Sequence, residues 1–174
     1  MSGASGEYLD LTRARHQPLG WAGTIGIAAL PRLASVVADT SGLASAKVHA
    51  KHDGGQITVQ GKVEANLLLT CQRCFRKMEF PVNTDFNLAW VRNETEAMNL
   101  ADVYEPLMSI SGRVNIAELI EDELLLALPM VALHAAPQKC DLGVRDIAPP
   151  VAAEPEVDPP NPFAALEVLK RGRH

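Results

Sequence analysis

The strongest constraint on the fold is an alternation of apolar and polar residues through positions 56–70, which read QITVQGKVEANLLLT. Odd positions from Ile57 to Leu69 carry apolar residues or glycine, and even positions from Thr58 to Asn66 carry polar ones. A period of two sustained over this length predicts an antiparallel strand with one face on a core and the other in water. The chain therefore needs a sheet with a covering layer on one face.

Turns are expected at both ends of this strand. Asp53 and Gly54 precede it and provide the positive-φ chemistry of a tight hairpin turn, with KVHAKH as the preceding strand. Beyond the strand, the alternation restarts at Lys77 and continues to Trp90, after the sequence CQRC at 71–74. We therefore expect two long hairpins that share the central strand.

Helical signals are fewer. Pro31 is placed to begin a short helix over residues 32–38. Residues 115–128, NIAELIEDELLLAL, carry an apolar stripe at helical spacing, with Asn115 as the N-cap and Glu118 suited to a capping box. The predicted fold class is therefore α+β, an antiparallel β-sheet built on long hairpins with a few packed helices.

The two ends of the chain differ in composition from its middle. Residues 1–24 have no clear period and are expected to form an N-terminal arm, followed by the α+β domain over residues 25–145. Residues 146–160 are crowded with proline and acids, which is typical of an extended linker. Residues 161–174 are expected to form a short C-terminal helix, because Asn161 can cap it and Pro162 suits its first position.

Composition limits the class of protein. The chain is 47% hydrophobic and 21% charged, as in ordinary globular domains. No apolar run approaches the ~20 residues that cross a bilayer, and the first residues contain acids and no apolar signal core, so we expect a cytoplasmic location and no membrane partner. A net charge of -5 argues against non-specific coating of nucleic acid. Charge is nevertheless segregated, since Lys47–Arg92 holds seven basic and four acidic residues and Asn93–Leu128 one basic and eight acidic.

The cysteines leave three interpretations open. Cys71 and Cys74 form a CxxC pair, and Cys140 lies far along the chain. A redox pair of the thioredoxin type needs a helix directly after it, whereas a strand is expected here. A turn of this spacing can aim both thiolates at one ion, and His134 with Cys140 would complete a Cys3His tetrahedron, which prefers zinc. Packing of small buried thiols is the third interpretation.

Other polar groups are candidates for contacts with partners. Phe75 suits stacking on a base or packing in the core. The basic side chains expected near the CQRC turn and available to RNA phosphates are Lys62, Arg73, Arg76 and Lys77. The acids of the 115–128 helix, which either bind a partner protein or form a solvated face, are Glu118, Glu121, Asp122 and Glu123. No glycine-rich phosphate loop, HExxH or nucleophile elbow occurs, so we expect no catalytic residue and no small-molecule substrate.

Four segments together carry a resemblance to a known family. LLLTCQRCFRKMEFPV, EAMNLADVYEPL, VNIAELIEDELLLALPMVALH and NPFAALEVLK resemble segments of the bacterial YceD-like family, the large ribosomal RNA subunit accumulation proteins. The resemblance extends from about the first hairpin to the C-terminus. It implies a non-enzymatic ribosome-biogenesis factor that supports the synthesis, processing or stability of 23S ribosomal RNA.

The resemblance also implies site residues and partners. The family is regarded as metal-binding and nucleic-acid-binding. Its cysteine motif falls on Cys71 and Cys74, and its downstream histidine and cysteine fall on His134 and Cys140, although relatives in other bacterial groups carry more cysteines there. The implied partner is ribosomal RNA or a precursor of the 50S subunit. An alternative function is a zinc-stabilised adaptor whose acidic helix and tail bind a partner protein, with an indirect effect on ribosomal RNA.

Overall fold

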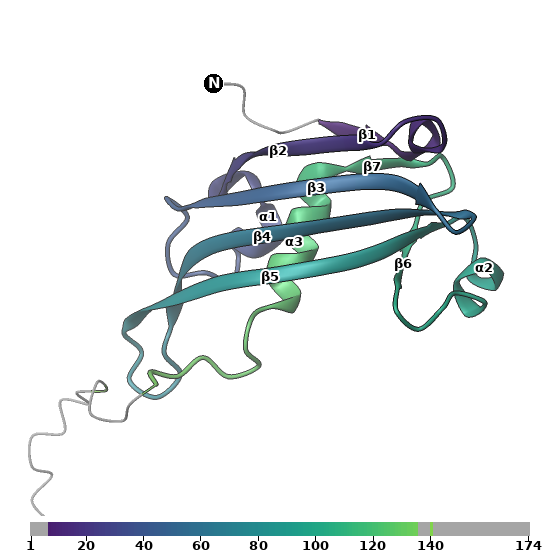
Figure 1. Ribbon diagram of the computed structural model, residues 1–174. Helices are drawn as coiled ribbons and strands as arrows, with labels where there is room; N and C mark the ends of the chain where they lie inside the picture. The colour runs from purple at the N-terminus through teal and green to yellow at the C-terminus, as the bar shows by residue number, and fades with distance from the viewer. Residues whose placement is uncertain (1–6, 136–139, 141–174) are drawn as a thin grey trace, which may run out of the picture. The chain divides into compact units, whose positions relative to one another are not determined.

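A five-stranded sheet organises the chain in the computed structural model, which describes residues 7–135 and residue 140. The strand order is β2-β3-β4-β5-β6, with the first three pairings antiparallel and the last parallel (Figure 1). The strands are β2 (Leu19–Gly26), β3 (Leu43–Asp53), β4 (Gln56–Thr70), β5 (Lys77–Val91) and β6 (Glu105–Met108). The α+β class predicted from the alternation is confirmed.

The two predicted hairpins are present and share β4. Asp53 pairs with Gln56 across a two-residue turn, in which Gly54 and Gly55 have φ of 57 and 90 degrees. These angles suit glycine because an L side chain rarely adopts them. Along β4 the odd positions are buried as predicted, apart from the half-buried Gly61, while Thr58 departs from the pattern because it is fully buried as well.

The N-terminal region differs from the expected arm. Residues 8–10 form β1, which pairs with β7 (Arg113–Asn115), and residues 11–15 form a 3-10 helix whose Leu11 is fully buried. The edge strand β2 then pairs along its whole length with β3. The sequence signal was weak here because glycines interrupt this strand and only one of its residues is buried. Residues 8–24 are therefore part of the folded unit.

Helices cover one face of the sheet. The helix α3 (Ile116–Leu126) lies behind the strands with the short α1 (Pro31–Ala34) beside it (Figure 1). The apolar stripe predicted for α3 is buried, and the side chain of Asn115 accepts a hydrogen bond from the Ala117 amide at 2.9 Å, which makes it the N-cap. The helix expected over 32–38 is shorter, since its regular part ends at Ala34.

The remaining elements lie between β5 and β7. A short helix α2 (Glu94–Met98) begins after Asn93, which caps it through Glu96 N, and β6 follows. No helix among the described residues is long and apolar enough to span a membrane. The linker expected over 146–160 and the helix expected over 161–174 lie outside the described residues.

Candidate metal centre

The CQRC segment forms the turn between β4 and β5. Two backbone hydrogen bonds close it, from the Cys71 amide to Arg76 O at 2.9 Å and from the Phe75 amide to Cys71 O at 2.8 Å. Phe75 has φ of 59 degrees, a left-handed conformation that is uncommon for a residue other than glycine. This reversal holds both cysteines of the pair at the end of the long hairpin.

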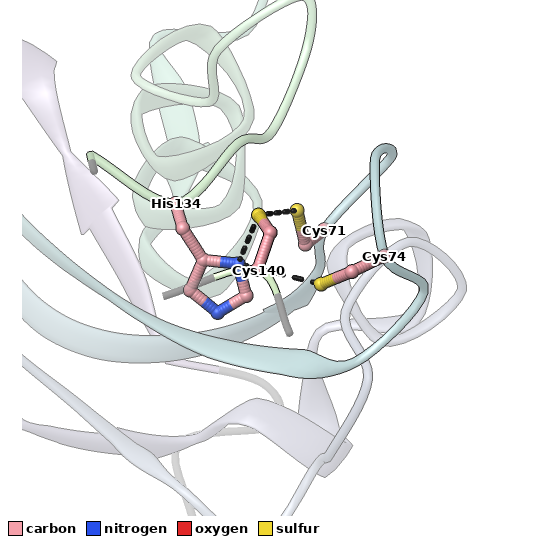
Figure 2. Close-up of side chains that lie close together, drawn as sticks. All are labelled: Cys71, Cys74, His134 and Cys140. Carbon is pink, nitrogen blue, oxygen red and sulfur yellow. Dashed lines mark hydrogen bonds between the residues drawn. The ribbon is translucent and has the colours of Figure 1, made fainter. Parts of the chain in front are cut away.

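The segment that follows α3 brings the other two candidate ligands to this turn. The Gln72 amide donates a hydrogen bond to Ala132 O at 2.8 Å, so the returning chain is attached to the turn just before His134. Figure 2 shows the side chains of Cys71, Cys74, His134 and Cys140 gathered there. Residues 60 or more positions apart in sequence therefore meet at one end of the sheet.

The four ligating atoms lie within 4.8 Å of one another. The Sγ atoms of Cys71 and Cys140 are 3.8 Å apart, and Nδ1 of His134 lies 3.5 Å from Cys74 Sγ and 3.3 Å from Cys140 Sγ. A tetrahedral zinc site with Zn–S of about 2.3 Å and Zn–N of about 2.0–2.1 Å has S–S separations of about 3.8 Å and S–N separations of about 3.5 Å. The donor set therefore fits a zinc ion in both chemistry and spacing, and the predicted convergence of these residues is confirmed.

Burial and hydrogen bonding give the sulfurs unequal properties. Cys71 is fully buried and Cys140 is nearly so, while Cys74 and His134 are half-buried. Burial raises the pKa of the Cys71 thiol, but backbone N–H groups of Arg73, His134 and Cys74 outweigh it and lower the pKa from 9.0 to about 5. Burial and the neighbouring thiolates instead raise the pKa of Cys140. The backbone N–H groups thus favour a thiolate on Cys71.

The geometry favours the metal interpretation of the CxxC pair over the redox and packing interpretations. The element that follows it is the strand β5, so no helix N-terminus lies beside the pair to favour thioredoxin-type chemistry. All three cysteines are free thiols. Packing alone gives no reason for an imidazole nitrogen to lie within 3.5 Å of two sulfurs, one of them on the β4–β5 turn.

The predicted RNA-binding side chains divide into two groups. Arg73, Arg76 and Lys77 lie exposed at the turn, where Arg73 Nη1 is 3.8 Å from Cys140 Sγ and Lys77 Nζ is 3.4 Å from Asp39. Lys62 lies in the middle of β4, about 25 Å from the turn at ~3.3 Å per residue, and pairs with Glu64. The turn therefore brings together three of the four.

Phe75 completes this surface. The sequence allowed Phe75 either to pack in the core or to stack on a base from an exposed position. In the structure its side chain is 80% exposed. We refer below to Arg73, Phe75, Arg76 and Lys77 as the basic turn.

The acids of α3 depart from the expected solvated face. Glu118 is exposed and contacts the Asn115 side chain, and Asp122 pairs with Arg32 at 2.6 Å. Glu121 is only 2% exposed and Glu123 only 8% exposed, so the prediction that these two project into solvent is wrong. Glu121 faces the start of α1, whereas Glu123 lies on the other flank of the helix, at a cavity that it shares with the loop leading into β6.

Glu121 has a structural partner that sequence analysis missed. Its carboxylate accepts hydrogen bonds from the Arg32 amide at 2.7 Å, the Leu33 amide at 3.0 Å and Arg32 Nε at 2.8 Å. The residue before α1 is Leu30, which makes no side-chain capping bond. An uncapped helix start at LPRL was a signal that another segment must satisfy those amides.

Comparison with known proteins gives one family. The family model described as large ribosomal RNA subunit accumulation protein YceD matches residues 59–170. A curated relative from Haemophilus influenzae, named large ribosomal RNA subunit accumulation protein YceD, is 33% identical over 116 residues, which are 66% of this chain and 66% of that protein. No solved structure matches.

Proposed function

The chain belongs to the large ribosomal RNA subunit accumulation protein family, and we propose that it supports the accumulation of large-subunit (23S) ribosomal RNA as a non-enzymatic, RNA-binding factor. The observation that carries this proposal is the position of the basic turn, which lies at the four-ligand cluster. In this proposal the cluster stiffens the turn, and the turn contacts RNA or an assembly intermediate of the large subunit.

The metal in the proposal is zinc. Cys71, Cys74, His134 and Cys140 supply three thiolates and one imidazole, a set that suits zinc better than magnesium or calcium. Four protein ligands fill a tetrahedron, so the site is of the structural type, without an open position for substrate. Such a zinc ion contributes on the order of 10 kcal/mol to folding. It would fasten the β4–β5 turn to the segment after α3.

The RNA contact in the proposal uses charge and stacking. The guanidinium groups of Arg73 and Arg76 and the ammonium of Lys77 offer N–H donors to phosphate oxygens. An aromatic ring exposed to the extent of Phe75 offers a face for an unpaired base, a contact worth ~1–3 kcal/mol per base. These are the elements of single-stranded RNA recognition, in which stacking and phosphate contacts act together.

The experiment that tests the proposal measures binding of the zinc-loaded full chain to transcripts of large-subunit ribosomal RNA over a range of salt concentrations. We expect the double variant Arg73→Glu, Arg76→Glu to bind more weakly and with a shallower salt dependence, because fewer counterions are released. The matched control is Lys47→Glu, Lys51→Glu, which makes the same charge change on exposed positions of β3.

Zinc content is measured for each variant, because Arg73 lies close to Cys140 Sγ. Equal affinity of the wild type and the Arg73, Arg76 variant, with zinc retained in both, would reject the basic turn as the RNA-binding surface.

A further inference from the structure

A second site lies where the outer edge of β5 is not paired with β6. The pairing of these strands begins only at Leu88, and a cavity of about 400 Å³ opens beside the preceding residues of β5. Its walls come from β5 (84–87), from the loop and strand start at 102–105, and from the C-terminal part of α3. None of these residues belongs to the metal centre or to the basic turn.

The cavity is strongly acidic. The carboxylates that line it are Asp85, Asp102, Glu105 and Glu123, and none of its described lining residues is basic. The rest of the wall contains apolar surface from Phe86 and Leu126 and the half-buried ring of Tyr104. We call this cavity the acidic pocket.

Glu123 is the feature that points to a ligand. It is 8% exposed, and no described residue gives its carboxylate a hydrogen bond or an ion pair. Burial and the charges of Glu105 and Asp122 raise its pKa to about 7. Glu121, two residues earlier, is also buried but accepts hydrogen bonds from three N–H groups. The Glu123 side chain is mostly buried and its carboxylate opens onto the pocket among other acids, so its charged form is disfavoured there, and a cation bound in the pocket would offset that cost.

The spacing of the carboxylates favours an organic cation over a bare metal ion. Among the described residues, only the cysteine–histidine cluster brings three or more ligating groups within reach of one ion. The pocket acids are therefore too dispersed, as placed, to coordinate a bare metal ion. A guanidinium presents five N–H donors in a planar fork, can lie against an aromatic ring such as Tyr104, and stands on an apolar stem that suits the Phe86 and Leu126 walls.

From these observations we infer that the acidic pocket binds an arginine side chain of a basic partner protein, with Glu123 as its buried counter-charge. The site is independent of the proposed RNA contact, since it lies on different elements and has the opposite charge. It also differs from the exposed acidic helix face expected from sequence, because Glu123 acts from within a cavity and Glu121 has no part in it.

The experiment titrates the zinc-loaded full chain with N-acetyl-arginine amide at low salt and follows backbone and side-chain amide signals by NMR. The expected result is a saturable shift of signals from the pocket, including the Asn87 side-chain amide. The citrulline counterpart of the probe, which has nearly the same shape and no charge, is expected to give no such shift. Equal binding of the two compounds would overturn the inference.

The variant Glu123→Gln preserves shape and removes the charge. It is expected to weaken arginine binding at least about tenfold, equivalent to about 1.4 kcal/mol. The matched control is Glu94→Gln, which removes one exposed acid outside the pocket and is expected to leave binding unchanged. Unchanged binding by Glu123→Gln would overturn the inference. If magnesium chloride shifts the same signals and binds with higher affinity than the arginine compound, that result would also overturn the inference, in favour of a metal site.

Discussion

Two glutamates of α3, two positions apart and both buried, are expected to respond in opposite directions to the same substitution. Glu121 accepts three hydrogen bonds, two from backbone amides at the start of α1 and one from Arg32 Nε. Glutamine at this position removes the charge and turns an NH2 group towards N–H donors. Bonds to a charged acceptor are worth about 1.5–3 kcal/mol each, so we expect Glu121→Gln to lower the free energy of unfolding by about 2–4 kcal/mol.

Glu123→Gln is expected to raise the free energy of unfolding at high pH. Burial and nearby charge raise the pKa of Glu123 from 4.5 to about 7. The folded state therefore retains a proton that the unfolded chain releases, and stability falls as the pH rises from about 4.5 to about 7. At about 1.4 kcal/mol per pKa unit the loss amounts to at most ~3.5 kcal/mol. The titratable groups facing Glu123 are Asp85, Asp102, Tyr104, Glu105 and Asp122.

Urea unfolding of the zinc-loaded wild type and both variants at pH 5.5 and pH 8 checks these expectations. Glu123→Gln should be more stable than the wild type at pH 8, by about 1–3 kcal/mol, and this advantage should shrink at pH 5.5. Glu121→Gln should be less stable at both pH values. A loss of stability in Glu123→Gln at pH 8, or a neutral Glu121→Gln, would refute the assignment of one glutamate as partnered and the other as unpartnered.

Three further predictions concern the sheet and the turn. Gly61→Ala should destabilise the protein by about 1–3 kcal/mol in urea unfolding, because a Cβ would lie 2.7 Å from Lys47 O and overlap the Phe86 ring, whereas Gly26→Ala, with open space around it, should be nearly neutral. Phe75→Gly should raise the free energy of unfolding by about 1 kcal/mol, because glycine adopts the positive φ of this position without strain. The same variant should bind RNA more weakly, because the stacking ring is lost. RNA binding equal to that of the wild type would show that Phe75 does not contact the RNA. Treatment with a chelator should lower the melting temperature, and added zinc should restore it; an unchanged melting temperature in zinc-depleted protein would count against a structural zinc.

The parts of the fold that could be predicted are those where burial repeats along the chain. The strands β4 and β5 have one face on the core, so the period of two in their sequence predicted both the pairing and the turn between them. The edge strand β2 buries only one residue, and glycine occupies three of its positions, so its sequence carried no period. Its place in the sheet is set by backbone pairing with β3, and a pattern of apolar and polar residues does not predict that pairing.

The ligands of the candidate site could be predicted from the sequence more readily than the environments of the α3 acids. The chemistry of Cys71, Cys74, His134 and Cys140 allowed a zinc cluster, which the sequence left open beside redox and packing interpretations, and the structure brings the four residues together. Helical periodicity treats Glu121 and Glu123 alike, as polar positions beside an apolar stripe. Their different environments depend on α1 and on the loop before β6, which pack against α3 from distant parts of the sequence.

Zinc analysis of untagged protein tests the central claim most directly, because the proposed stiffness of the basic turn depends on the ion. Elemental analysis of the wild type should give one zinc per chain, and the variants Cys71→Ser and Cys140→Ser should lose it, whereas Cys140 could be replaced without effect if it only packs. Zinc-free wild-type protein that stays fully folded and fails to take up added zinc would contradict the account.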